Sequence, residues 1–351
     1  MSAVRSAPAK PSLYGMDDEE MRALVLEEGA PTYRAGQILE WVYKKHILSF
    51  DEAKNIPAGL RESLAAGVRV SSLTADLTRA SEESTKFLFK TADGRVLESV
   101  LISQRGRETV CVSTQLGCKI GCVFCASGKG KFGRNLTAGE IVEQAAQIGR
   151  STGRRVTNVV FMGMGEPLDN FEATMKALKI LQAPWGFGLG ARRITVSTSG
   201  IAPKILEFVK RSEGRVRLSV SLHSSDEKTR TGLVPLNKRY GLRELEAALR
   251  KIHGGLKREI TFEYTVIAGI NDSRKEAEGV AHIAKPLNAK VNLIAYNPIR
   301  EMNFKTPSPE VVEAFRDILL KRGVRATVRR TAGRGINAAC GQLRLDREEE
   351  G

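Results

Sequence analysis

From residue 108 onward the sequence alternates between short apolar runs and longer amphipathic segments. The apolar runs are rich in Val, Ile and Thr and are too short to be buried helices. They therefore predict strands at 108–114, 158–162, 194–198, 216–222, 259–267 and 291–296. The segments between them predict helices at 137–149, 171–182, 201–211, 242–253 and 273–284, followed by a helix at 309–321 and a strand at 326–330.

This order of strands and helices is typical of parallel βα units in an α/β fold. Right-handed crossovers would curl such units into an open barrel or a doubly wound sheet. Both architectures bind ligands at the carboxyl ends of their strands. Thr137 and Glu140 have the spacing of a capping box, which predicts where the first of these helices begins.

The residues before and after this region predict separate parts of the chain. The first fifteen residues are rich in Pro, Ala and Ser, which is typical of a flexible tail. A small helical accessory domain should follow, because Ile38, Val42 and His46 recur on one helical face. Two strands at 86–90 and 95–102 would link it to the barrel. The predicted parts are a tail (1–15), the helical accessory domain (16–85), linking strands (86–107), a partial (β/α)6 barrel (108–300) and a C-terminal segment (301–351).

The charge of the chain favours a polyanionic partner. The 351 residues include 55 Lys and Arg against 40 Asp and Glu, a formal net charge of +15. Nucleic acid is the first expectation, because each neutralised phosphate releases counterions; a basic but merely solvated surface is the alternative. Lys129, Lys131 and Arg134 stand where a substrate would enter. No apolar run has the length of a membrane span or of a signal-peptide core, so a cytoplasmic protein is expected.

Three of the five cysteines form a CxxxCxxC motif on the loop after the first predicted barrel strand. Cys118, Cys122 and Cys125 could direct three thiolates to one inorganic centre. A structural zinc site usually has four ligands, whereas three thiolates suit a [4Fe–4S] cluster with one iron left open. Zinc with Cys111 as a fourth ligand, a disulfide, and buried cysteines without a metal remain alternatives.

The motif and its surroundings resemble the radical S-adenosylmethionine (SAM) superfamily, and within it the RlmN/Cfr family of RNA adenine methyltransferases. The resemblance runs from about residue 16 to residue 343, and its segments are VCVSTQLGC (110–118), GMGEPL (163–168), STSG (197–200), SLH (221–223) and AACGQL (338–343). It implies that Cys118, Cys122 and Cys125 bind the cluster, whose open iron binds SAM. It also implies a SAM site made by Gly165, Glu166, Ser197, Ser221, Leu222, His223 and Asn297.

The resemblance further implies that the methyl group travels on a cysteine. Cys340 would accept a methyl group from one SAM, and a radical made from a second SAM would activate it for addition to the adenine. Cys111 would then attack the sulfur of Cys340 and release the methylated base, with Glu98 as the proton acceptor. The family has an Asp where this chain has Gly335, which leaves one carboxylate near Cys340 missing.

These implications predict a methyltransferase acting on carbon 2 of an adenine in 23S rRNA, with tRNA as a further substrate. The accessory domain would bind RNA, an electron donor such as flavodoxin or ferredoxin would serve the cluster, and the enzyme would act as a monomer. A Cfr-type carbon-8 methyltransferase and a non-catalytic Fe–S or zinc RNA-binding protein are the alternatives. Cys111 and Cys340 distinguish the last of these, because a binding module has no use for a reactive pair outside the cluster.

Overall fold

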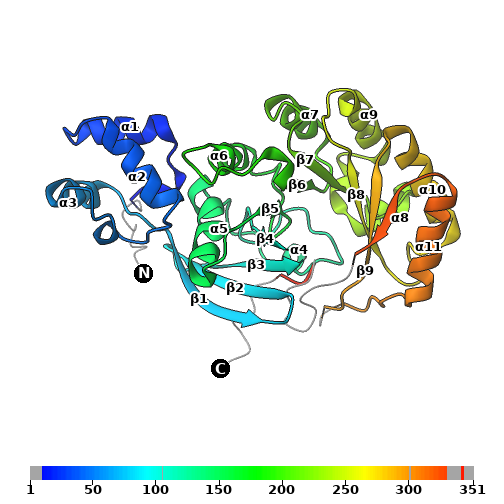
Figure 1. The fold of residues 1–351 in the computed structure, drawn as a ribbon. Coiled ribbons are helices and arrows are strands. Elements are labelled where there is room, and N and C mark those ends of the chain that lie inside the picture. The colour runs from blue at the N-terminus through cyan, green and yellow to red at the C-terminus, as the bar shows by residue number, and fades with distance from the viewer. Residues whose placement is uncertain (1–9, 105, 300–301, 330–340, 344–351) are drawn as a thin grey trace, which may run out of the picture.

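The computed structural model describes residues 10–104, 106–299, 302–329 and 341–343. Its ten strands form one sheet in which every strand lies beside its neighbours in the chain (Figure 1). The strands are β1 (Leu73–Ala80), β2 (Ser84–Thr91), β3 (Val96–Gln104), β4 (Arg107–Cys111), β5 (Asn158–Phe161), β6 (Ile194–Thr198), β7 (Arg217–Ser221), β8 (Thr261–Val266), β9 (Lys290–Ala295) and β10 (Ala326–Val328). The first four are antiparallel, and β4 to β10 are parallel.

Helices flank this curved sheet and fill the connections between its parallel strands (Figure 1). They are α1 (Asp18–Glu27), α2 (Tyr33–Tyr43), α3 (Ala58–Gly67), α4 (Ala126–Lys129), α5 (Ala138–Thr152), α6 (Phe171–Gln182), α7 (Ala202–Arg211), α8 (Glu227–Leu233), α9 (Leu242–His253), α10 (Arg274–Ala284) and α11 (Pro309–Lys321). The capping box at the start of α5 forms as expected: Glu140 N–H donates to Thr137 Oγ1, and Thr137 N–H donates to Glu140 Oε2.

The strand order decides between the two architectures that the sequence left open. A doubly wound sheet reverses its strand order at a switch point. Here β4 to β9 follow one another without a reversal, so the α/β region is a partial barrel of six parallel strands, as predicted. The sheet also extends further than six strands. β10 adds a parallel strand beside β9, and β1 to β3 add an antiparallel extension beside β4.

Two expectations for the N-terminal region need correction. The predicted flexible tail reaches residue 15, but Leu13 and Tyr14 are fully buried in a short 3₁₀ helix. The predicted helical range of 16–85 contains a whole strand, β1, as well as three helices. Leu73, Ala75 and Leu77 alternate with polar residues, which is a short strand pattern that the helical interpretation of this range overlooked. The register with β2 shifts between Ala75 and Leu77.

The accessory helices pack directly against the barrel. Lys176 and Lys179 on α6 pair with Glu20 at 2.6 Å and with Asp17 at 2.7 Å. Gly15 meets Gly139 at the start of α5 so closely that a Cβ on Gly139 would lie 2.9 Å from the Gly15 nitrogen. One continuous apolar cluster runs from Leu13 to the barrel helices. Because the apolar cluster is continuous, the two regions share one hydrophobic core, and the ion pairs add contacts at its surface.

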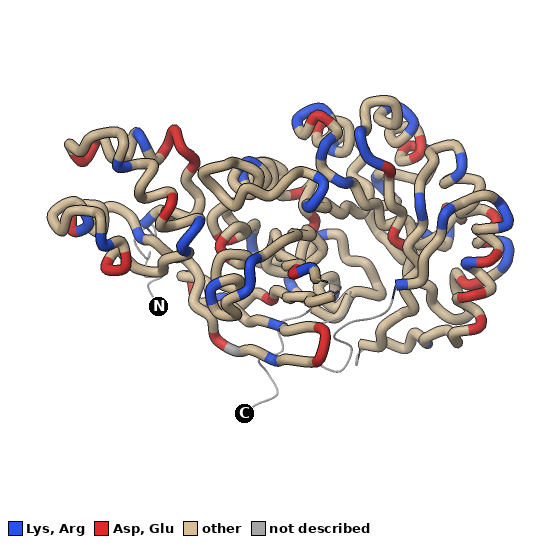
Figure 2. The backbone as a smooth tube through the Cα atoms, viewed as in Figure 1, with Lys and Arg blue, Asp and Glu red and all other residues tan. Residues whose placement is uncertain are grey.

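Charged side chains are spread over both regions. Figure 2 shows basic residues on the accessory helices and on the barrel helices, with acidic residues interspersed among them. In the described parts of the chain, no helix combines the length and apolar character needed to cross a bilayer.

Candidate active site

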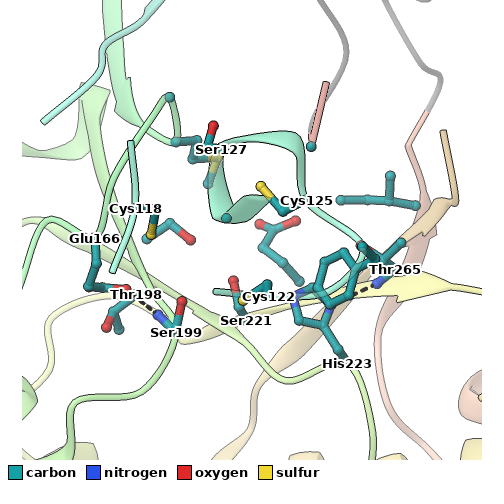
Figure 3. Close-up of a pocket in the computed structure, with 18 of the residues that line it drawn as sticks. Cys118, Cys122, Cys125, Ser127, Glu166, Thr198, Ser199, Ser221, His223 and Thr265 are labelled. Atoms are coloured by element: carbon teal, nitrogen blue, oxygen red, sulfur yellow. Dashed lines mark hydrogen bonds between the residues drawn. The ribbon is translucent and has the colours of Figure 1, made fainter. Parts of the chain in front are cut away.

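A pocket opens at the carboxyl ends of β5 to β9, next to the loop that follows β4 (Figure 3). Most of the residues predicted for the cluster and for SAM line it together, although they come from the carboxyl ends of five different strands and the loops that follow them. They are Cys118, Cys122, Cys125, Gly165, Glu166, Ser197, Ser221, His223 and Asn297. The tertiary structure therefore brings the predicted cluster motif and the predicted cofactor residues to one place.

Three of the predicted residues that the structure describes do not belong to this lining. Leu222 is 1% exposed and packs in the main hydrophobic core, so its side chain does not face the pocket. Glu98 and Cys111 lie on the neighbouring strands β3 and β4. Cys340 lies outside the described residues.

The cysteine loop folds tightly around its own backbone. Cys125 N–H donates to Cys122 O at 3.1 Å, and α4 begins directly after Cys125. At Gly128 a Cβ would lie 2.8 Å from the Cys122 oxygen, so only glycine permits this close return of the loop. The side chains of Ile120 and Phe124 pack in a small apolar cluster that the three cysteines also contact. These contacts hold the three thiols on the pocket side of the loop.

Burial disfavours ionisation of the Cys118 and Cys122 thiols. Burial raises the pKa of Cys118 to about 12, and the nearby Cys125 thiol adds to the rise. Burial also raises the pKa of Cys122 well above its usual range, with repulsion from Cys125 and Cys118 in the same direction. Thiolates grouped in this way need a positive centre between them. The donor set therefore suits a cationic metal group.

Glu166 is held by the backbone of the strands around it. Its carboxylate accepts hydrogen bonds from Ser199 N–H at 2.7 Å and from Leu168 N–H at 3.0 Å. Burial raises its pKa, and these hydrogen bonds oppose that rise. The preceding Gly165 has a φ of 100°, and a Cβ there would lie 2.6 Å from the Gln115 side chain. The glycine thus lets the turn after β5 pass close to the loop after β4.

His223 is a neutral imidazole in a strained backbone position. Its φ is 57°, which is uncommon for a residue with a side chain. Thr265 N–H donates to His223 Nδ1 at 3.0 Å, so the neutral ring carries its proton on Nε2. Burial and the nearby Arg230 lower its pKa to about 3. Phe124 contacts the ring edge-on, with 4.6 Å between ring centroids. His223 can therefore serve as a fixed N–H donor but not as a base with an ordinary pKa.

Residues 341–343, close to the C-terminus, reach this pocket. Gly341, which is covalently bonded to Cys340, lines the pocket with the three cysteines of the loop. Its carbonyl accepts a hydrogen bond from Ala126 N–H at 2.8 Å. Ser127 Oγ donates to Leu343 O at 2.6 Å, and Gln342 Nε2 donates to Pro298 O at 3.1 Å. Residues more than 200 positions apart in sequence therefore meet at α4.

Cys111 lies in an apolar cluster that includes the same chain end. The buried members of this cluster are Val100, Cys111, Met164 and Leu343. Leu343 thus contacts the surroundings of Cys111, while Gly341 contacts the cysteine loop. Residues 341–343 thus contact both the cysteine loop and the surroundings of Cys111.

Glu98 forms an ion pair that is almost fully buried. Lys86 Nζ lies 2.9 Å from Glu98 Oε1, and the two side chains are 4% and 1% exposed. Glu98 and Val100 project from the same face of β3, since residues two apart on a strand share a face. Val100 in turn pairs in register with Cys111. The carboxylate and Cys111 therefore lie on the same side of the sheet.

Comparisons with known proteins agree with this geometry. The model of the radical SAM superfamily matches residues 112–278, which include the cysteine loop and most of the pocket. The model of the ribosomal RNA large subunit methyltransferase N-terminal domain matches residues 12–70. Two curated relatives are "Probable dual-specificity RNA methyltransferase RlmN" of Geobacillus kaustophilus and its RlmN 3 counterpart of Opitutus terrae. They are 42% and 43% identical to the chain, and each match spans 99% of this chain and 97% and 98% of the relative.

The chain belongs to the RlmN family. A crystal structure of a radical SAM methyltransferase from Sphaerobacter thermophilus supports the assignment, with a TM-score of 0.91 and 44% identity over 95% of this chain and 99% of that one. The radical SAM superfamily uses a [4Fe–4S] cluster and SAM. The residues of this chain fit both groups, because three thiols that need a positive centre line a pocket with polar side chains from several strands.

Within this RlmN-family fold, the sequence reading missed two buried charged residues. Arg230 on α8 is 0% exposed. It donates to Ser199 O at 2.8 Å, Ser221 O at 3.2 Å and Leu222 O at 3.0 Å. It thereby ties together the ends of β6 and β7 beneath the pocket. Glu263 on β8 lines the pocket and is 6% exposed. No sequence motif marks Arg230 or Glu263. Glu263 could have been noticed as a charged residue inside an otherwise apolar strand, whereas Arg230 has no such signal.

Arg134, one of the three basic residues predicted near the substrate entrance, bonds to carboxylates of the chain itself. Its guanidinium donates to Glu140 at 2.7 and 2.8 Å and to Asp93 at 2.9 Å. These bonds link the start of α5 to the turn between β2 and β3. Arg134 is therefore a structural residue in this fold, because its donors are directed at carboxylates of the chain.

Proposed function

We propose that this chain methylates carbon 2 of a specific adenine in 23S rRNA and of an adenine in tRNA. Its membership of the RlmN family and the names of its relatives as RNA methyltransferases support this function. The relatives carry the RlmN name, which favours carbon 2 over the Cfr-type carbon 8. The net charge of +15 suits an RNA substrate.

In this proposal Cys118, Cys122 and Cys125 hold a [4Fe–4S] cluster. When bound, the cluster supplies the electron for reductive cleavage of SAM. The pocket residues of the chain orient SAM: Glu166 presents a carboxylate fixed by two backbone N–H groups, and His223 presents its Nε2–H. Gly165, Ser197, Ser221 and Asn297 complete the SAM site. Leu222 contributes through its backbone position between Ser221 and His223, because its side chain lies in the core.

A single observation carries the proposed route of the methyl group: the covalent neighbour of Cys340 lines the pocket that contains the three cluster cysteines. The Cys340 thiolate would accept the methyl group from one SAM. Removal of one hydrogen atom from that group, by the radical made from a second SAM, would let its carbon bond to carbon 2 of the adenine. Cys111 would then attack the Cys340 sulfur; the new S–S bond forms as the bond from sulfur to the transferred carbon breaks, the carbon takes up a proton to become the methyl group, and the single electron left over leaves through the electron-transfer chain. Glu98 accepts the proton that leaves the adenine carbon. A non-catalytic binding module would need neither cysteine.

The remaining parts of the proposal concern partners and location. A small electron-transfer protein such as flavodoxin or ferredoxin would reduce the cluster. The chain would work as a monomer in the cytoplasm, where thiols stay reduced. Its accessory helices, which match the N-terminal domain of the methyltransferase family, would contact the RNA.

The decisive experiment compares Cys340→Ala with Cys111→Ala in anaerobically prepared holoenzyme. We expect Cys340→Ala to abolish methylation of 23S rRNA while it retains the cluster absorbance and reductive cleavage of SAM. We expect Cys111→Ala to accumulate a covalent protein–RNA adduct, because the carrier bond cannot be resolved. Mass mapping of the methylated nucleotide distinguishes carbon 2 from carbon 8. A colourless, zinc-loaded preparation, or methylation by Cys340→Ala, would refute the proposal.

A further inference from the structure

Four neighbouring barrel strands present a row of polar side chains to the barrel interior. Register pairing places Ser221 of β7 opposite Glu263 of β8, Glu263 opposite Asn292 of β9, and Asn292 opposite Thr327 of β10. Phe262 and Tyr264, on either side of Glu263, belong to the main core. Because successive residues of a strand point to opposite faces, Glu263 projects the other way, into the barrel.

Hydrogen bonds along this row all run toward one oxygen of Glu263. Thr327 Oγ1 donates to Asn292 Oδ1 at 2.6 Å, and Asn292 Nδ2 donates to Glu263 Oε1 at 3.2 Å. Ser219 Oγ donates to the same Oε1 at 3.1 Å from the other side. The carboxyl group is therefore anchored in a defined orientation, and its other oxygen, Oε2, is left over.

Glu263 Oε2 is buried, and no hydrogen-bond partner is found for it within the described residues. The residue is 94% buried and lines the same pocket as the cluster cysteines and His223. Burial raises the pKa of Glu263, and Arg329, which also lines the pocket, opposes that rise. A buried acceptor without a partner is costly unless a ligand supplies the missing donor.

We propose that Glu263 Oε2 accepts a hydrogen bond from an O–H or N–H group of the nucleoside bound in this pocket. The nucleoside is part of SAM or is the adenosine of the RNA substrate; both offer ribose hydroxyls and an exocyclic amine. The inference rests on the proposed function for the identity of the ligand, and it adds a binding residue that the RlmN resemblance did not supply. Asn292, Ser219 and Thr327 act as positioning residues, since they hold the carboxyl group and do not line the pocket.

Equilibrium binding to the anaerobic holoenzyme tests this contact without turnover. S-adenosylhomocysteine and an RNA hairpin with one unpaired adenine serve as probes, and calorimetry measures each Kd. Loss of one hydrogen bond to a buried charged group corresponds to about a 10- to 100-fold loss of affinity. We expect Glu263→Gln to weaken one of the two probes by this factor, and that probe identifies the nucleoside. Glu143→Gln is the matched control: Glu143 is a buried glutamate of α5 that bonds to Ser71 and Ser72, away from the pocket.

Analogues of the weakened probe locate the donor. We expect one analogue, 2′-deoxy or N6-dimethyl for either probe or 3′-deoxy for S-adenosylhomocysteine, to bind the wild type weakly but to lose nothing more on Glu263→Gln. Thermal unfolding and cluster absorbance establish that the variant is folded and loaded. Unchanged affinity of Glu263→Gln for both probes would overturn the inference while the proposed function stands. If the wild type bound neither probe, the proposed function itself would fail.

Discussion

Lys86 and Glu98 form an ion pair that is almost completely withdrawn from water, at the edge of the site where Cys111 lies. Taking two charges out of water is expensive, and mutual attraction at 2.9 Å offsets that cost only while both partners are present. Burial likewise disfavours the charged forms of the Cys118 and Cys122 thiols, of His223 and of Glu263. At the scale of single residues, several of the buried charged and titratable groups of this protein lie around the pocket and Cys111.

Replacing Lys86 should therefore cost more than replacing another lysine of the same strand. We expect Lys86→Met to lower the free energy of unfolding by about 3–5 kcal/mol, because the Glu98 carboxylate loses the ammonium group beside it. Lys86→Arg, which keeps the charge, should recover part of this loss. Lys90→Met is the matched control, since Lys90 lies on β2 but is exposed. Urea unfolding measures all three, and equal effects of the two Met variants would contradict the argument.

The buried neutral state of His223 predicts how stability depends on pH. Its pKa is about 3 in the folded chain, against 6.5 in an unfolded chain, so below pH 6.5 the unfolded state binds a proton that the folded state does not. Stability should thus fall as the pH falls through 6.5, by about 1.4 kcal/mol between pH 7.5 and 5.5. The His223→Asn variant should not show this pH-dependent loss of stability. Asn suits the position because it tolerates a positive φ. Unfolding curves at the two pH values test it; identical pH dependence would show that the folded histidine is protonated.

At the scale of elements, local signals and tertiary contacts contributed differently. The capping box of α5 and the amphipathic pattern of α6, α7 and α9 place these helices within three residues of their predicted ends. α8 was not predicted, because its seven residues carry only a weak pattern and its buried Arg230 resembles an ordinary surface arginine. β1 was missed although Leu73, Ala75 and Leu77 alternate with polar residues, because the pattern is short and includes Asp and Ala, which are depleted in strands.

Asp17 connects the first helix with the barrel and predicts a measurable effect on that element. Its carboxylate caps α1 through Glu20 N–H at 3.1 Å and also accepts from Lys179 Nζ of α6 at 2.7 Å. We expect Asp17→Ala to destabilise α1 by about 1–2 kcal/mol, as the loss of an N-cap does. Amide hydrogen exchange of residues 18–27 measures this change. Asp18→Ala removes an ion pair with Arg22 at the helix surface, and it should change the free energy of exchange by less than about 0.5 kcal/mol. A larger effect there would contradict the assignment of the cap.

At the scale of the whole molecule, one continuous core joins the accessory helices to the barrel, and the net charge of +15 would attract the phosphates of the proposed RNA substrate. Affinity for an RNA hairpin should fall at least about tenfold between 50 and 200 mM salt, because phosphate contacts release counterions. Binding of S-adenosylhomocysteine inside the pocket should change by less than about twofold. Fluorescence anisotropy and calorimetry measure the two. An RNA affinity that is independent of salt would mean that the charge excess has no part in substrate binding.

The amino-acid sequence alone determined the six barrel strands and most of the helices between them, the α/β class and the three cysteines of the loop, because hydrophobic periodicity and ligand spacing are local properties of the chain. The roles of individual residues in the site stay predictions. Only the tertiary structure decided that the barrel strands follow one another without a reversal, that Gly341 meets the cysteine loop, that Leu222 faces the core, and that Glu263 ends a row of hydrogen bonds with one oxygen left over. Each of these depends on contacts between residues far apart in the chain, which no local pattern records.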